Sequence, residues 1–171
     1  MTFSDRLLLL RRCRGFTLLE MLVVIVVIGL AAALGYAQLE ADPRRALERE
    51  GSRLAGALEH AALLAQWKNE TIGVSAADRA YRFWRRSPAT DGERWSALSD
   101  DDVLTPRALP APLLVNARSY AGQPVPAGAV LPLFPSGRNE PYVIELAAPE
   151  WQLLLAADPL NRVALLGPSP R

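Results

Sequence analysis

The chain has 171 residues, enough for one folded domain and one additional segment, and a formal net charge of +1. The first 15 residues carry four arginines against one aspartate, a charge of +3, and subtracting this from +1 leaves −2 for residues 16–171. Since no strong basic field follows residue 15, the composition gives no indication of bulk attraction to nucleic acid, and no nucleic-acid partner is expected.

The amino-terminal stretch Arg14–Glu20 (RGFTLLE) joins a basic leader to an apolar run. A glycine ends the leader, a phenylalanine follows, and Glu20 stands at the start of a run without charged residues from Met21 to Ala37. Interrupted only by Glu20, the apolar run beginning at Leu18 has the length of roughly 20 residues that a membrane-crossing helix needs. A carboxylate at the edge of such a run is costly and indicates a function and a charged partner.

Three interpretations of this segment differ in where the chain is cut. A cleaved secretory signal would use small residues such as Ala31–Ala33, but its apolar region is usually shorter than this one. An uncleaved anchor with its amino terminus inside follows the positive-inside rule, yet it leaves Glu20 and the Gly15–Phe16 junction unexplained. The third interpretation is a prepilin-type signal that is cut after Gly15.

The motif resembles the amino terminus of type IV pilins and pseudopilins. The resemblance implies that a membrane peptidase and methyltransferase cuts between Gly15 and Phe16 and then methylates the new amino group of Phe16. It places Glu20 at the acidic fifth position of the mature chain. In this family the glutamate is held to meet the amino terminus of a neighbouring subunit. Pairing of Glu20 with a neighbour's Phe16 would then set the axial register, because an unpaired charge in a low-dielectric environment costs several kcal/mol.

The only cysteine, Cys13, precedes the predicted cut, so the mature chain is expected to lack a thiol and a disulfide. A lipid anchor on Cys13 is disfavoured. Its signal would need small residues directly before the cysteine, where Arg11 and Arg12 stand.

A second helical segment is expected beyond the apolar run. Pro43 follows Asp42 and would kink or restart a helix there. Apolar residues then recur at intervals of 7, 4, 3 and 4, which is typical of a one-faced helix. These residues are Leu47, Leu54, Leu58, Ala61 and Ala65. We expect a removed leader at residues 1–15, a transmembrane helix over residues 16–41 and its amphipathic continuation over residues 42–68.

Residues 69–171 are predicted to form an antiparallel β domain. Three strand-like runs near the carboxyl end, separated by turn residues, indicate a meander. They are Tyr142–Leu146, Trp151–Leu155 and Arg162–Leu166. Seven prolines between Pro106 and Pro135 indicate edge strands and loops, and the role of this segment stays open. The expected fold class is α+β, with a long amino-terminal helix packed on an antiparallel sheet.

The carboxyl-terminal part resembles the H-type (GspH) minor pseudopilins of the type II secretion system. The resemblance rests on Phe134–Gly137, on Trp151 in a following strand and on a final Asn-Arg-Val turn and strand. A departure is Asp158–Asn161, where the family often has a glycine in the last hairpin.

The resemblance also implies a function, a location and partners. It implies a structural subunit at or near the tip of the pseudopilus, anchored once in the inner membrane with its carboxyl-terminal domain in the periplasm. Other minor pseudopilins, the major pseudopilin, the prepilin peptidase and exported proteins would be its partners. The alternative is a minor pilin of a type IV pilus, in assembly or DNA uptake.

Candidate catalytic or ligand-binding residues are few, and we expect neither an enzyme nor a cofactor or metal. His60, the only histidine, lacks catalytic partners in the sequence, and Ser136 lacks a nucleophile-elbow motif. Asp100–Asp102 lacks the spacing of a calcium loop and is predicted to be a solvated acidic loop. Alternation within Tyr81–Arg86 favours a strand with one core face over a nucleic-acid patch. Three tryptophans are expected as core or interface anchors: Trp67, Trp95 and Trp151.

Overall fold

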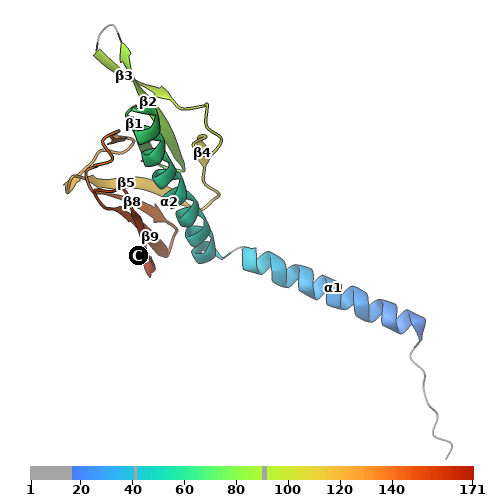
Figure 1. Cartoon of the computed structure of the whole chain (residues 1–171). Coiled ribbons are helices and arrows are strands. Elements are labelled where there is room, and N and C mark those ends of the chain that lie inside the picture. The colour runs from blue at the N-terminus through green and yellow to red at the C-terminus, as the bar shows by residue number, and fades with distance from the viewer. Residues whose placement is uncertain (1–16, 41, 90–91) are drawn as a thin grey trace, which may run out of the picture. The chain divides into compact units, whose positions relative to one another are not determined.

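The structure is a computed structural model that describes residues 17–40, 42–89 and 92–171. The chain divides into two compact units, Met1–Glu40 and Ala41–Arg171, and each is described by itself. Figure 1 shows a helix in the first unit, and a second helix with two β-sheets in the other. The elements confirm the predicted α+β class.

Helix α1, Leu18–Glu40, makes up the first unit. Thr17 caps it, because the Thr17 hydroxyl oxygen accepts a hydrogen bond from the Glu20 backbone N–H at 3.2 Å. Within the described residues, no helix meets the combined length and hydropathy required to cross a membrane.

Helix α2, Pro43–Lys68, begins the second unit with a strong cap at each end. The Asp42 carboxylate accepts a hydrogen bond from the Arg44 N–H at 2.9 Å, and Pro43 occupies the first helical position, where no N–H is needed. At the other end Asn69 takes a left-handed conformation, φ 51°, and its N–H bonds the carbonyls of Ala65 and Gln66. The helix therefore begins and ends close to the predicted residues.

The first sheet has the strand order β3-β2-β1-β7, with β4 also paired to β2. All of its pairs are antiparallel. The strands are β1 (Ile72–Ala77), β2 (Ala80–Ala89), β3 (Gly92–Ala97), β4 (Arg107–Ala108) and β7 (Val130–Leu133). Alternation along β1 and β2 buries Ile72, Val74 and Phe83 on the face toward the core.

The second sheet has the order β10-β9-β8-β5-β6 and contains the predicted carboxyl-terminal meander. Its strands are β5 (Leu114–Tyr120), β6 (Gln123–Pro124), β8 (Tyr142–Ala147), β9 (Trp151–Ala157) and β10 (Val163–Pro170). The predicted antiparallel β domain thus contains two sheets. The chain passes from the first sheet to the second after β4, returns to the first sheet for β7, and passes back to the second sheet for β8.

The core lies where α2 packs on both sheets (Figure 1). A Cβ atom at Gly51 would overlap Leu153 Cδ2, so this glycine lets the α2 backbone approach β9 closely. Side-chain hydrogen bonds hold the last hairpin to the helix. Asn161 Nδ2 donates to the Leu58 carbonyl at 2.9 Å, and the Tyr142 hydroxyl donates to Asn161 Oδ1 at 2.7 Å.

Asn161 also accounts for the departure from the family pattern in this hairpin. Its φ is 57°, in the left-handed region that glycine or asparagine accepts most readily. An asparagine thus occupies the turn conformation for which glycine is suited, and its side chain adds the two hydrogen bonds to α2 and β8.

Candidate functional site

The structure describes the predicted register residue, Glu20, but not the predicted processing site. Gly15 and Phe16 lie outside the described residues, so the cut between them stays a prediction. Glu20 is described: it occupies the third position of α1, is exposed, and receives the Thr17 cap through its backbone. A carboxylate there is stabilised by the positive end of the helix dipole and remains available to a cation outside the chain.

Beyond Glu20, the side chains of α1 up to Leu30 are apolar on every side. Large hydrophobic residues from Leu18 to Leu30 are exposed, with exposed fractions from 41% at Val24 to 85% at Leu18. A helix that is apolar all round requires an apolar environment or covering neighbours, because a surface helix of a soluble domain keeps a polar face. Exposed apolar surface of this kind is typical of helices that contact lipid or other helices.

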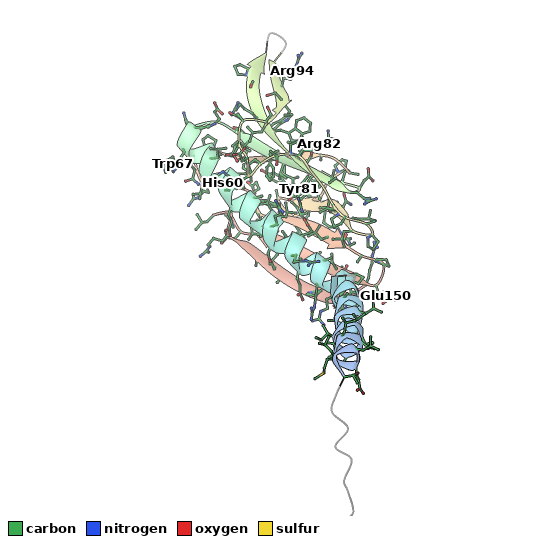
Figure 2. The ribbon with its side chains drawn as sticks, turned by 90° about the vertical axis from the view of Figure 1, so that its right-hand side faces the viewer. His60, Trp67, Tyr81, Arg82, Arg94 and Glu150 are labelled. Carbon is green, nitrogen blue, oxygen red and sulfur yellow. The ribbon has the colours of Figure 1, made fainter. Side chains whose placement is uncertain are left out.

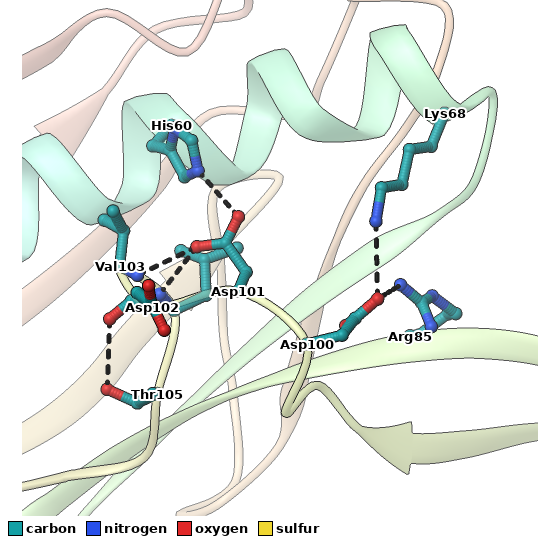
Figure 3. Close-up of polar contacts among 9 residues, drawn as sticks. His60, Lys68, Arg85, Asp100, Asp101, Asp102, Val103 and Thr105 are labelled. Carbon is teal, nitrogen blue, oxygen red and sulfur yellow. Dashed lines mark hydrogen bonds and ion pairs between the residues drawn. The ribbon is translucent and has the colours of Figure 1, made fainter.

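His60 links α2 to the loop that follows β3. Its Nε2 lies 3.0 Å from Asp101 Oδ2, as Figure 3 shows, and Asp101 Oδ1 accepts from the backbone N–H groups of Val103 and Leu104. Burial opposes ionisation of Asp101, but these hydrogen bonds outweigh it and hold its pKa below the ordinary value. The pair ties the loop between β3 and β4 to α2.

Asp100 provides a second tie in the same loop (Figure 3). Its Oδ2 accepts from Arg85 Nη2 at 2.8 Å and from Lys68 Nζ at 3.4 Å. The hydrogen bond from Arg85 is the main reason that the pKa of Asp100 falls to about 2. Glu70 Oε2 also lies 2.8 Å from Arg85 Nε, as an ion pair without hydrogen-bond alignment.

The acidic loop Asp100–Asp102 is thus attached to basic and backbone groups of the protein itself. The prediction of a solvated acidic loop needs correction for Asp101, whose side chain is only 16% exposed. In the part of the chain that the structure describes, no group of three or more histidine, cysteine or acidic residues is arranged to hold a metal ion.

The Phe134–Gly137 motif forms a turn. The Gly137 N–H donates to the Phe134 carbonyl at 3.2 Å, and the Phe134 N–H donates to Asn139 Oδ1 at 2.6 Å. Ser136 Oγ is engaged with the backbone of Arg138, at 3.3 Å from both its N and its O. These contacts show that the Ser136 side chain stabilises the turn.

The basic and aromatic run Tyr81–Arg86 lies in β2 and has two distinct faces. Tyr81 and Phe83 are buried and contact each other edge to face, with ring centroids 6.1 Å apart. Arg82 is exposed on the opposite face. This arrangement confirms the predicted strand with one core face.

The three tryptophans singled out in the sequence have different surroundings. Trp67 is 89% exposed and is not a core residue; Figure 2 shows it on the outer side of α2. Together with His60, Leu63 and Leu64 it lines an apolar cavity of about 380 Å³. The other two are half-buried beneath guanidinium groups: Arg44 lies 5.3 Å from the Trp151 ring centroid, and Arg86 lies 5.9 Å from that of Trp95.

Two bidentate ion pairs within the second unit were not predicted from the sequence. Glu50 on α2 accepts from Arg107 at 2.7 and 2.9 Å, and Glu145 on β8 accepts from Arg118 at 2.7 and 2.8 Å. Both carboxylates are buried. Glu50 could have been found, because it stands on the apolar face of α2 between Leu47 and Leu54, where an acid needs a partner.

Known proteins resemble this chain at its amino terminus and over most of its length. A family model, the prokaryotic N-terminal methylation motif, matches residues 10–36. The type II secretion system protein H of Aeromonas hydrophila is 27% identical over 175 residues, which cover 91% of this chain and 94% of that protein.

Solved structures extend the likeness to the fold. Two structures of the minor pseudopilin EpsH from the type II secretion system of Vibrio cholerae match with TM-scores of 0.56 and 0.60, at 19% and 16% identity. The matches cover 72% and 75% of this chain and 98% of each solved chain. The predicted resemblance to H-type pseudopilins and the pilin-like fold are thereby confirmed.

Proposed function

We propose that this chain is a minor pseudopilin of a type II secretion system, a structural subunit at or near the pseudopilus tip that assists export of folded proteins across the outer membrane. The observation that carries the proposal is that two independent kinds of match occur in the same chain. The methylation motif covers residues 10–36, and similarity to a type II secretion system protein H extends over 91% of the chain. The name of that relative favours secretion over a role in a type IV pilus.

The proposal assigns a place to each part of the chain. The leader at residues 1–15 is removed, residues 16–41 anchor the protein in the inner membrane, and residues 42–171 stand in the periplasm. The arginines of the leader support this orientation through the positive-inside rule. The anchor is supported by the charge-free run from Met21 to Ala37 and by the exposed apolar side chains of α1.

The mechanism is one of assembly. Glu20 pairs with the methylated amino group of Phe16 in an adjacent subunit and so sets the axial register of the assembly. The β domain contacts other pseudopilins, and growth of the pseudopilus moves the exported protein outward. Cleavage after Gly15 and methylation of Phe16 are carried out by the prepilin peptidase and not by this chain.

Mass spectrometry of the protein purified from membranes tests the processing step. We expect a mature chain that begins at Phe16 and carries one added methyl group. An intact Met1, or an amino terminus produced by a cut after Ala33, would contradict the prepilin signal. A start at Phe16 without the methyl group would retain the cut and overturn the modification.

Replacement of Glu20 tests the assembly step in a strain that lacks the native gene. Glu20→Ala should be inserted and processed like the wild type, but should fail to enter the pseudopilus and fail to restore secretion. Glu20→Gln should fail in the same way, because it removes the charge that pairs with the amino group. Glutamine is as well suited as glutamate to the third helical position, so the helix itself should be unaffected.

Thr17→Ala is the matched control for Glu20. It removes the hydroxyl cap on the same helical turn and leaves the carboxylate in place. The register role predicts normal secretion for Thr17→Ala, measured as exported protein in the culture medium against protein retained in the periplasm. Full secretion with Glu20→Gln would contradict the register role.

A further inference from the structure

The first sheet has an outer face, directed away from the core, that carries tryptophan and arginine side chains. Strand alternation places every second residue of β2 on this face, because Tyr81 and Phe83 of the same strand are buried on the other. The register of β2 with β3 puts Trp95 opposite Arg86. The arginine–tryptophan face consists of Arg82, Trp84, Arg86 and Trp95.

Both tryptophans of this face are held in place by the protein itself. Trp84 Nε1 donates a hydrogen bond to Ser75 Oγ at 2.8 Å. A Cβ atom at Gly73 would overlap Val130 Cγ1 and lie 2.7 Å from the Trp95 ring, so the glycine makes room for that ring. Rings that are already ordered lose little conformational freedom when a partner covers them, which favours their use as contact residues.

Arg82 gives the face an unused positive charge. It is exposed and forms no hydrogen bond or ion pair with any residue that the structure describes. Arg85, on the opposite face of the same strand, already contacts Asp100 and Glu70. A partner that covers the arginine–tryptophan face must therefore supply an anion to Arg82, because a guanidinium left unpaired on desolvation is costly.

We propose that the arginine–tryptophan face docks an acidic surface of a neighbouring pilin-type subunit, with a carboxylate of that subunit paired to Arg82 and apolar side chains packed on Trp84 and Trp95. Tryptophan and arginine are enriched among the residues that dominate protein interfaces. The charge of Arg82 selects the acidic partner, and the two rings supply apolar contact area. The identity of the partner as a pilin-type subunit rests on the proposed function.

The test uses the full chain in cells with a photoreactive amino acid at Ala97, an exposed position of β3 on the same face. We expect an adduct with another pseudopilin, joined near an acidic residue that mass spectrometry identifies. Arg82→Glu should lower the yield of this adduct about tenfold, because like charges then oppose each other across the contact. Replacing the partner's identified acid with arginine should restore the yield in the Arg82→Glu background.

Arg94→Glu is the matched control, since it makes the same charge change on the same hairpin (Figure 2). Arg94 pairs with Ser87 in the β2–β3 register, so it belongs to the opposite face and should not change the yield. Equal loss with both variants would overturn the proposal, as would an adduct with nucleic acid or no adduct at Ala97.

A second photoreactive position at Val26 in α1 separates this proposal from the proposed function. Cross-links to pseudopilins from Val26 but not from Ala97 would overturn the docking face alone. If neither position cross-links to a pseudopilin, both the docking face and the proposed function fail.

Discussion

At the scale of single residues, Glu50 shows how a buried carboxylate is accommodated on the apolar face of α2. Its oxygens accept two hydrogen bonds from Arg107, 57 residues away in sequence. We expect Glu50→Gln to lower the free energy of unfolding at pH 7 by about 1.5–3 kcal/mol, the usual contribution of a hydrogen bond to a charged group. Urea denaturation followed by circular dichroism measures the change. Glu48→Gln is the control and should cost less than about 0.5 kcal/mol, because its ion pair with Arg44 is exposed.

The same residue predicts a dependence of stability on acid. The hydrogen bond from Arg107 holds the pKa of Glu50 below its ordinary value of 4.5, although burial opposes this. The unfolded chain therefore takes up this proton at a higher pH than the folded chain does. The stabilisation is complete above the ordinary pKa and is lost as the pH falls through the lower folded pKa. The difference in unfolding free energy between wild type and Glu50→Gln should accordingly shrink as the pH is lowered from 7 to 3, and a constant difference would contradict this account.

At the scale of elements, the packing of α2 on β9 depends on one of two glycines in the same helix. A Cβ at Gly51 would overlap Leu153, which is only 1% exposed and has little room to move. A Cβ at Gly56 would meet no atom within 4 Å. We expect Gly51→Ala to destabilise the protein by about 1–3 kcal/mol through overpacking. Gly56→Ala should instead stabilise it by up to about 1 kcal/mol through helix propensity. Thermal unfolding of both variants gives the comparison, and changes of the same sign would exclude close packing as the cause.

At the scale of the whole molecule, Asn161 links the last hairpin to a helix 103 residues earlier in the chain. Its replacement by alanine removes the hydrogen bonds to Leu58 and Tyr142. It also places at φ 57° a residue that accepts the left-handed conformation less readily than asparagine does. We expect Asn161→Ala to lower the free energy of unfolding by about 2–4 kcal/mol, since two buried groups lose partners. Asn161→Gly separates the causes: it relaxes the backbone but loses the same hydrogen bonds, so it should remain clearly destabilised. Wild-type stability of Asn161→Gly would show that the backbone conformation alone matters.

The sequence by itself determined the features that depend on neighbours along the chain. The motif around Gly15, Phe16 and Glu20 is read from adjacent residues, as are the restart at Pro43, the apolar face of α2 and the carboxyl-terminal strands. Each depends on local spacing, cap chemistry or strand alternation, which a short window contains.

Only the tertiary structure decided how distant segments meet. The division into two sheets, the pairing of Glu50 with Arg107 and the exposure of Trp67 depend on strand register and on which surfaces cover one another. Long-range pairing is determined by many weak contacts acting together, so no single residue in the sequence predicts it. The arginine–tryptophan face shows both kinds of feature: alternation along β2 puts Arg82, Trp84 and Arg86 on one face, and only the register of β2 with β3 adds Trp95 to them.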